Sequence, residues 1–460
     1  MNERQTKNIM GTIPVPKLML KMGIPMILSM ILQAVYNIVD SAFVSNMSKN
    51  GEAALNALTL SFPLQMLMVA IGIGTGVGAN ALLSKSLGEG NKEKASKTAG
   101  NAIFLAIVIY IVFLMFGIFG VRFYISTQTS NTLIFNMAAD YLRICCIISF
   151  GIVFFSIYEK LLQSTGHSLY STIAQIAGAV TNIILDPILI YGLVGLPEMG
   201  VKGAAYATVI GQCVSCMLAL LFHLKVNNDI SNDIKYIKPC AKIIRQIYTI
   251  GLPAIISQAL MSVMTYGLNI ILGSISESMV TAYGLYYKIQ QFILFAAFGL
   301  RDAITPIISF SHGMKSKIRI YDGIKFGLLY TLIIMLAGTA VVEIFTVPLS
   351  NIFGLSGNTQ SLCISAMRII SISFVFAGAN IAFQGIFQAL DGGIESLIVS
   401  VCRQLIFVLP VAWIFAQIAK NNTGSSWLVW TSFLIAEILS AVISILLLIK
   451  LNRKIKDFLE

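Results

Sequence analysis

The sequence predicts an all-α polytopic membrane protein with twelve transmembrane helices in two pseudo-symmetric halves, and three observations lead to this fold class. Of the 460 residues, 57% are hydrophobic and only 11% are charged, so a soluble protein of this composition would expose large apolar patches. The apolar residues fall into twelve runs, and most of these exceed the roughly 20 residues that a spanning helix needs. The two halves of the chain also repeat several short motifs.

The predicted spans show no sustained alternation of apolar and polar residues, so transmembrane strands are not expected. They cover residues 18–45, 54–83, 99–120, 134–159, 169–193, 201–224, 246–273, 280–309, 323–346, 362–388, 394–418 and 427–450. Lys and Arg gather in both terminal tails and in the loops after the second, sixth and eighth spans. By the positive-inside rule, we expect both termini in the cytoplasm. This placement accounts for the formal net charge of +11 without a nucleic-acid partner.

Residues 225–245 are the longest polar stretch and separate two halves of six spans each. We therefore predict a cytoplasmic N-terminal tail (1–17), an N-lobe (18–224), a cytoplasmic linker (225–245), a C-lobe (246–450) and a cytoplasmic C-terminal tail (451–460). Four segment pairs recur 225 to 228 residues apart: Gly23–Pro25 with Gly251–Pro253, Leu58–Gln65 with Tyr283–Gln290, Tyr141–Arg143 with Ala366–Arg368, and Gln163 with Gln388. Because each half has an even number of spans, both halves have the same orientation in the membrane. Transporters built from two such repeats bind their substrate between the repeats, so we expect the transport pathway there.

The first span carries a polar face near its end. Gln33 and Asn37 are four residues apart, Tyr36 and Asp40 are four apart, and Asn37 and Asp40 are three apart. These helical spacings place the four residues on one side of a helix. A carboxylate near the centre of a spanning helix costs about 2.5–3.5 kcal/mol on insertion scales, so it normally faces a protein interior or a water-filled cavity. Two interpretations are open: an ion or proton site, or an Asp at the helix end that reaches lipid headgroups.

The fifth span carries a second such face. Gln175, Gly178, Asn182 and Asp186 share one side of the helix. Pro187 follows, and a proline inside a helix frees a carbonyl and kinks the chain. A carboxylate, an amide and a free carbonyl suit the binding of Na⁺ or a proton. The alternative is a helix break near the membrane surface with Asp186 in water.

The other charged residues of the spans suggest structural roles. We expect Lys288, Arg301, Asp302, Arg403 and Glu437 to form internal pairs rather than to line a cavity. Glu159 and Lys160 end the predicted fourth span, so an interfacial position is expected for them. The segment that corresponds to Asp40 in the second half, 262–269, contains no acid, so the acidic machinery is concentrated in the first half.

No enzyme signature is present. The chain lacks a Walker lysine loop, an HExxH motif and a nucleophile elbow, so we expect a secondary transporter that has no catalytic residues and no cofactor. Without an ATP site it must use an ion gradient. The three histidines and seven cysteines are too dispersed to predict a metal site, so Na⁺ at the coupling site is the one metal ion considered.

The chain resembles the multidrug and toxic compound extrusion (MATE) family, and within it the MepA-like branch of bacterial members. The resemblance covers residues 15–450. It is carried by Gly23–Pro25, Tyr36–Asp40, Asn182–Gly192, Gly200–Thr208 and Leu434–Glu437. The sequence Asn182-Ile-Ile-Leu-Asp186-Pro187 is the most specific of these segments.

The resemblance implies two six-helix lobes around a central cleft in a bacterial cytoplasmic membrane. It implies export of lipophilic cationic small molecules in exchange for H⁺ or Na⁺. Family members with an acidic N-lobe bind the coupling cation at positions that match Asp40, Asn182, Asp186 and Thr208. Candidates for the cavity wall are Gln33, Tyr36, Asn37, Gln163 and Gln175. We expect a monomer whose only other partner is the lipid bilayer.

Two other functions stay open as alternatives. A flippase for a lipid-linked saccharide has the same wider architecture, but its cavity should carry several cations to hold a pyrophosphate, and here the intramembrane cations are few. A channel or membrane enzyme is less well supported, because a channel does not require two acidic helix faces in one of two repeats.

Overall fold

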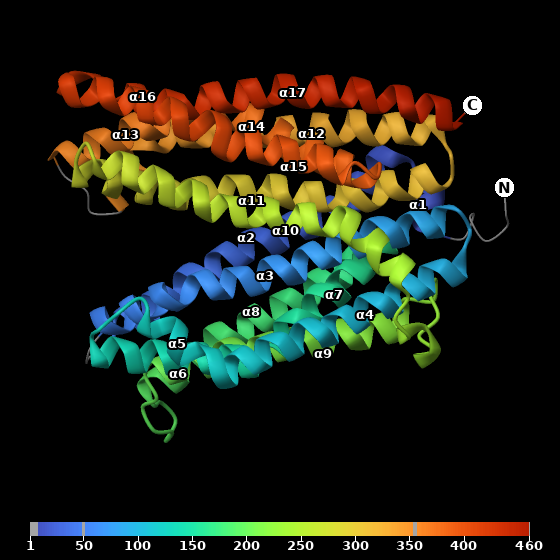
Figure 1. Cartoon of the computed structure of the whole chain (residues 1–460), viewed down its shortest axis with the longest axis horizontal. Helices are drawn as coiled ribbons and strands as arrows, with labels where there is room; N and C mark the ends of the chain where they lie inside the picture. Colours follow the sequence, from blue (N-terminus) through green and yellow to red (C-terminus); the bar gives the residue numbers. More distant parts are fainter. Residues whose placement is uncertain (1–7, 48–50, 353–356, 460) are drawn as a thin grey trace. The chain divides into compact units, whose positions relative to one another are not determined.

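The computed structural model describes residues 8–47, 51–352 and 357–459, and nearly all of them lie in helices (Figure 1). The first elements are α1 (Ile9–Thr12), α2 (Val15–Ser45), α3 (Gly51–Gly88), α4 (Lys92–Met115), the π-helix η1 (Phe116–Gly120), α5 (Val121–Ser126), α6 (Thr132–Ile147), α7 (Phe150–Ser164), α8 (Ser168–Tyr191), α9 (Val201–Val226) and the 3-10 helix η2 (Ile234–Ile237). The remaining elements are α10 (Ala241–Gly273), α11 (Glu277–Gly313), α12 (Lys317–Ile352), α13 (Gly357–Ser371), α14 (Phe374–Ala389), α15 (Gly393–Val401), the π-helix η3 (Cys402–Phe407), α16 (Val408–Asn421), the 3-10 helix η4 (Thr423–Ser425) and α17 (Leu428–Leu459).

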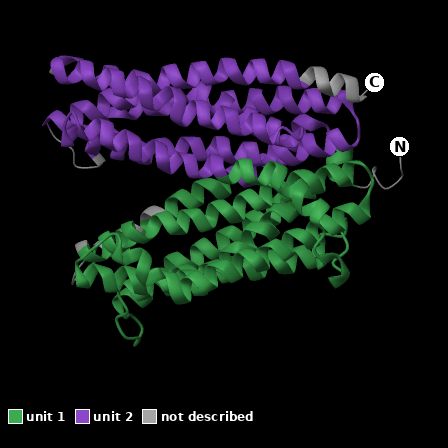
Figure 2. Cartoon of the chain, viewed as in Figure 1, with its two compact units in different colours: residues 1–13, 28–255 green, residues 14–27, 256–460 purple. Residues whose placement is uncertain are grey.

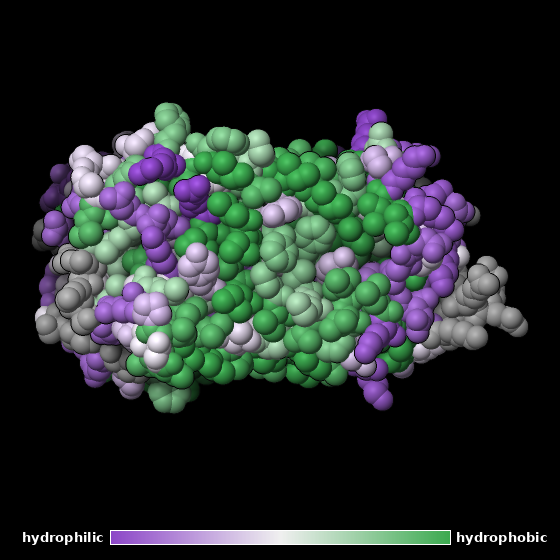
Figure 3. Space-filling model, turned by 90° about the horizontal axis from the view of Figure 1, so that it is seen from below, coloured by the Kyte–Doolittle hydropathy of each residue, from purple (hydrophilic) through white to green (hydrophobic). Residues whose placement is uncertain are grey.

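The described residues contain ten helices that are long and apolar enough to cross a membrane, and two bent helix pairs raise the number to as many as twelve. Each of the twelve predicted spans corresponds to one of these helices or pairs. The predicted all-α polytopic fold is therefore confirmed. On the face drawn in Figure 3, hydrophobic side chains form a broad band and hydrophilic side chains gather at both ends, as expected for a surface in contact with lipid.

The prediction of single helices over residues 134–159 and 362–388 is wrong. Each span is broken into two helices: α6 and α7 meet with a bend of 46°, and α13 and α14 with a bend of 52°. The fourth span of each half is thus the broken one, so the break itself belongs to the repeat.

Neither break contains a proline, and the local hydrogen bonds supply the cause. The backbone N–H of Ser149 donates to the carbonyl of Cys146 at 3.3 Å, and that of Ser373 donates to the carbonyl of Ile370 at 2.9 Å. Bonds to the residue three positions back tighten the turn relative to an α-helix, which changes the direction of the chain. The tripeptide Ile-Ser-Phe occurs at both breaks. A comparison of the two halves could therefore have marked the position of the break, which helix periodicity does not reveal.

The chain forms two compact units (Figure 2). Unit 1 comprises residues 1–13 and 28–255, and unit 2 comprises residues 14–27 and 256–460. Both α2 and α10 therefore contribute residues to each unit. In each helix the change of unit comes three residues after the proline of the Gly-x-Pro motif, Pro25 or Pro253.

Within unit 1, the long helices run side by side around an apolar core (Figure 1). Buried side chains of α3, α4, α7 and α9 meet there, among them Leu83, Ile157 and Leu161. The polar linker after α9 packs against α4, because the backbone N–H of Cys240 donates to Asn101 Oδ1 at 2.7 Å. Asn8 Nδ2 donates to Asp229 Oδ2 at 2.8 Å, and burial raises the pKa of the Asp229 carboxyl above its ordinary value.

Unit 2 has its own core, formed by side chains of α10 to α14, α16 and α17. Trp430, Tyr283, Tyr286 and Phe374 are completely or almost completely buried in it. Large aromatic side chains contribute much of the burial energy of such cores.

Matching hydrogen bonds in the two units support the internal repeat. Ser84 Oγ on α3 donates to the carbonyl of Ser164 on α7 at 3.0 Å. Ser309 Oγ on α11 donates to the carbonyl of Ala389 on α14 at 3.2 Å. Each residue of the second pair lies 225 positions after its counterpart, so the second and fourth spans of both halves meet in the same register.

The orientation of the chain in the membrane stays a prediction, and impermeant labelling tests it. Single cysteines at Asn91 and Asn232, in a variant without the seven native cysteines, should resist a membrane-impermeant maleimide in intact cells, whereas one at Asn422 should react. The reason is that Asn91 and Asn232 lie in the Lys- and Arg-rich loops that the positive-inside rule places in the cytoplasm. Labelling of Asn232→Cys from outside the cell would contradict the predicted orientation, and permeabilised cells provide the control for reactivity.

Candidate functional site

Helices α2 and α8 of unit 1 are joined by side-chain contacts at both ends of their interface. On one side Gln175 accepts a hydrogen bond from Ser29 Oγ and donates from Nε2 to Gln33 Oε1 at 3.2 Å. Further along both helices, Tyr191 Oη donates to the carbonyl of Phe43 at 2.7 Å. Residue numbers rise together on the two helices, so α2 and α8 run parallel, as the first and fifth spans of one half must.

Between these contacts the carboxyl groups of Asp40 and Asp186 lie within direct interaction distance of each other. Asp186 is completely buried and Asp40 is half-buried. One oxygen of each, Asp40 Oδ1 and Asp186 Oδ2, is buried without a hydrogen-bond partner in the described part of the chain. The ring of Tyr36 is close to both carboxyl groups. Two carboxylates in contact repel each other unless a cation neutralises at least one of them.

Helix α9 supplies the remaining part of the cluster, because two glycines let it approach α8 closely. A Cβ atom at Gly178 would lie 2.5 Å from the carbonyl oxygen of Gly211, and one at Gly211 would lie 2.6 Å from the carbonyl oxygen of Gly178. One turn away, Asn182 Nδ2 lies 3.4 Å from Asp186 Oδ1 and 3.5 Å from Thr208 Oγ1. The Asn182 side chain therefore connects the buried acid to the hydroxyl on α9.

The four candidate coupling residues thus lie together in unit 1. Asn182 Oδ1 is also buried without a partner among the residues that the structure describes. The cluster therefore offers three unpartnered oxygen atoms, from Asp40, Asn182 and Asp186, with the Thr208 hydroxyl beside them. Carboxylate, amide and hydroxyl oxygens are the ligands that hard cations prefer, and the same carboxylates can take up a proton. The described residues contain no group of three or more His, Cys, Asp or Glu side chains arranged for a metal ion.

A cavity of about 70 Å³ adjoins this cluster within unit 1. That volume accommodates several water molecules. Among the candidate cavity residues of the sequence, Gln33, Tyr36 and Gln175 line it, and so do Asn182 and Thr208. The side chain of Asn37 lies outside the described residues.

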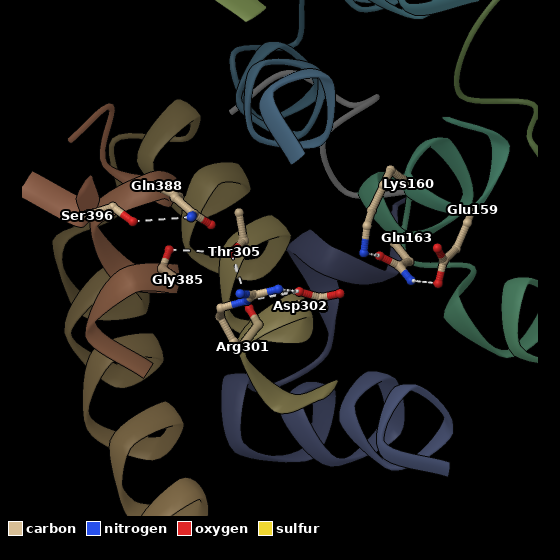
Figure 4. A network of polar contacts seen from close by, with 9 residues as sticks. All are labelled: Glu159, Lys160, Gln163, Arg301, Asp302, Thr305, Gly385, Gln388 and Ser396. Carbon is tan, nitrogen blue, oxygen red and sulfur yellow. Dashed lines mark hydrogen bonds and ion pairs between the residues drawn. The ribbon is translucent and has the colours of Figure 1, made fainter. Parts of the chain in front are cut away.

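Gln163 is not part of the cavity wall, whereas Glu159 is. Gln163 Nε2 donates to Glu159 Oε1 at 3.0 Å, and Lys160 Nζ donates to Gln163 Oε1 at 3.0 Å (Figure 4). The expectation of an interfacial position for Glu159 and Lys160 is wrong, because they are 6% and 1% exposed. They do not end the span, because α7 continues to Ser164 rather than ending at the predicted 159.

The predicted internal ion pairs are confirmed for Arg301 with Asp302 and for Arg403 with Glu437, although the second pair also lines a small cavity. For Lys288 the prediction is wrong, because its side chain is exposed and has no ion pair among the described residues. Asp302 Oδ1 accepts hydrogen bonds from Arg301 Nε at 3.1 Å and Arg301 Nη2 at 2.8 Å (Figure 4). Arg403 Nε donates to Glu437 Oε1 at 2.6 Å. Pairing of this kind offsets the cost of a charge in a membrane-embedded segment.

In each half, a long cationic side chain packs over a glycine where the second and fourth spans meet. In one half the fourth span carries the cation and the second span the glycine, and in the other half the reverse holds. In unit 1, a Cβ atom at Gly76 on α3 would lie 2.7 Å from Lys160 Cγ on α7. In unit 2, a Cβ atom at Gly385 on α14 would lie 2.8 Å from Arg301 Cγ on α11. Arg301 lies 225 positions after Gly76, and Gly385 lies 225 positions after Lys160. The contact between the second and fourth spans therefore has room for one cation, which either helix can supply.

Comparison with known proteins agrees with this architecture. The MatE family model matches residues 25–188 and again residues 253–414, one match in each half. The multidrug export protein MepA of Staphylococcus saprophyticus is 25% identical over 441 residues, which cover 95% of this chain and 94% of MepA. MepA of Staphylococcus aureus strain NCTC 8325 is 27% identical over 461 residues, which cover 96% of this chain and 95% of MepA.

Solved structures show the same fold. A crystal structure of a MATE protein in complex with MaL6 superposes with a TM-score of 0.89 at 23% identity and covers 99% of both chains. An outward-facing multidrug resistance MATE transporter gives a TM-score of 0.88 at 24% identity and covers 96% of both chains. Because the family model matches most of the chain, in both of its six-span halves, this protein belongs to the MATE family of membrane transporters.

Proposed function

We propose that the protein is a cation-coupled antiporter that exports lipophilic organic cations across the bacterial cytoplasmic membrane. In this proposal it works as a monomer with both termini in the cytoplasm, and Asp40, Asn182, Asp186 and Thr208 bind the coupling H⁺ or Na⁺. The observation that carries it is the contact between two buried carboxyl groups, each with an unpartnered oxygen. The relatives named as multidrug export proteins support the substrate class.

The proposed coupling follows from the charge of this cluster. An inward flow of H⁺ or Na⁺ neutralises the carboxylates, and release of the cation restores a negative site. A cationic substrate is favoured in the second state, because both cations depend on the same negative charge. Competition for that charge is sufficient to link the two binding reactions, and the linkage is reciprocal.

The experiment that tests the function is ethidium transport in proteoliposomes with independently set pH and Na⁺ gradients. We expect an imposed gradient of one cation to drive ethidium out of the compartment, and the gradient that succeeds identifies the coupling ion. An anionic dye of similar size should not move, because the cavity beside the cluster is lined by the acid Glu159 and by several amides. Transport of the anionic dye without transport of ethidium would contradict the proposed substrate class.

A further inference from the structure

Unit 2 contains a small cavity of its own around the guanidinium of Arg403. Its volume is about 30 Å³, which is room for about two water molecules. Arg403 is only 8% exposed, and it is one of the residues that line the cavity. A carboxylate group, with two oxygens on one carbon, is similar in size to two waters.

The guanidinium has unused hydrogen-bonding capacity. It carries five N–H donors, and among the described residues only the one on Nε has a partner, Glu437 Oε1. Both oxygens of Glu437 have a partner, because the second one accepts from Asn380 Nδ2 at 2.8 Å. Asn380 Oδ1 in turn accepts from Ser444 Oγ at 3.1 Å. The pair is thus held rigidly on the carboxylate side and leaves both terminal nitrogens of Arg403 free.

The backbone at this position supplies a second, independent observation. Arg403 and the adjacent Gln404 lie in the π-helix η3, which interrupts the span between α15 and α16. Such π-helical turns are rare and occur often at functional sites. Gln404 also lines the cavity, and its Oε1 is buried without a partner in the described part of the chain. Two neighbouring side chains with unused polar atoms therefore meet at one cavity.

Part of the cavity wall is apolar. Met264, Phe298 and Phe433 contribute to it, and flexible methionine together with aromatic rings suits the body of an organic molecule. A guanidinium end presents two parallel N–H donors that match the two oxygens of a carboxylate. A quaternary ammonium has no acceptor for these donors, so it gains nothing from them.

We propose that Arg403 anchors a carboxylate subsite in unit 2, which binds organic zwitterions through their acidic group. The apolar body of the ligand contacts Met264, Phe298 and Phe433. This inference rests on the proposed export function in one respect, because it assumes that the ligand is a transported molecule. What it adds is the assignment of carboxylate recognition to one residue of unit 2.

Two fluorescent dyes that differ only at the carboxylate test the proposal. Rhodamine 110 is a zwitterion with a free carboxylate, and rhodamine 123 is its methyl ester. Their dissociation constants for the purified protein in detergent are measured by fluorescence anisotropy, which requires no ion gradient. We expect Arg403→Gln to weaken rhodamine 110 binding by about tenfold or more, since a charge-assisted bidentate contact is lost. Rhodamine 123 binding should change by less than about twofold.

Glu437→Gln is the companion variant, and it should act in the opposite direction. Removing the competing carboxylate leaves the positive charge of Arg403 uncompensated, so rhodamine 110 should bind more tightly than to the wild type. Arg368→Gln removes an exposed guanidinium of the same unit and serves as the matched control, with both dyes unaffected. Size-exclusion profiles establish that each variant is folded.

Equal weakening of both dyes by Arg403→Gln, or no binding of rhodamine 110 to the wild type, would overturn the proposal. Displacement of rhodamine 110 by phosphatidylglycerol but not by phosphatidylcholine would also overturn it, because the site would then hold a lipid phosphate. Failure of the export function is seen separately, as absence of gradient-driven ethidium transport by the wild type.

Discussion

Replacing either buried acid of the coupling cluster, as Asp40→Asn or Asp186→Asn, should abolish gradient-driven efflux while leaving expression and membrane insertion intact. Asparagine has nearly the shape of aspartic acid, so the packing of α2 against α8 is retained. It resembles the neutral form of the carboxyl group, yet it cannot release a proton or hold Na⁺ by charge. We expect ethidium efflux from energised vesicles to fall by at least about tenfold, because the cluster can no longer exchange the coupling cation for the substrate.

Asn182→Ala is the graded comparison for this experiment. The amide contributes a ligand oxygen and the contact with Thr208, but it carries no charge, so its loss should reduce efflux less than loss of either acid. All variants are compared at equal amounts of protein in the membrane. Near-normal efflux from both Asp→Asn variants would show that the acids are structural. The coupling residue would then have to be sought elsewhere, beginning with Glu159 at the cavity wall.

Exchange of the glycine and the cation in unit 1 should rescue two variants that are each strongly destabilised. Gly76→Arg alone inserts a side chain where Lys160 Cγ lies and adds a second buried cation, whereas Lys160→Gly alone removes the cation beside Gln163. Breaking a buried charged network costs about 3–5 kcal/mol, and overpacking costs about 1–3 kcal/mol. The double variant reproduces the arrangement of Arg301 and Gly385, so it should lose roughly 1–2 kcal/mol at most.

Apparent melting temperatures of the purified proteins in detergent measure this rescue. Adding Val77→Asp to the double variant places an acid where unit 2 has Asp302, and it should improve stability further. If the double variant were less stable than the sum of the two single effects predicts, the idea that the contact holds one exchangeable cation would be wrong. Gly76→Ala, which adds one methyl group without charge, separates the steric effect from the electrostatic one.

The fold class was predictable because membrane insertion places strong and simple demands on sequence. A spanning helix must be apolar for about 20 residues, so the twelve spans stand out by hydropathy alone. The polar faces of α2 and α8 were equally visible, because a few polar residues within an apolar helix stand out at helical spacing. The prediction that Asp40 and Asp186 act together still depended on which helices are neighbours, which hydropathy does not determine.

The features that sequence analysis missed depend on tertiary geometry. The breaks before α7 and α14 contain no proline, and the serines that mark them are common in unbroken helices. Because the break before α7 was missed, Glu159 and Lys160 were placed at the membrane surface, although they are buried. The helix α8 continues through Pro187 to Tyr191, so the loss of one backbone hydrogen bond at the proline does not end the helix. The cavity around Arg403 involves residues from four separate stretches of the chain, which no local pattern connects.

The reciprocal places of glycine and cation constrain how the two halves of the chain diverged. If both descend from one duplicated six-helix ancestor, one copy had to replace its glycine and its cation in separate mutational steps. If the glycine is replaced first, an intermediate protein has two long cations in the space of one. If the cation is replaced first, the intermediate protein has none. We expect both intermediates to be less stable than either arrangement seen in this protein. Selection against them is relaxed while the other six-helix copy keeps the original contact. Lys160 contacts Gly76, and Arg301 contacts Gly385 with the two residue types exchanged. This indicates that the exchange took place after duplication, when a second intact copy of this helix pair already existed.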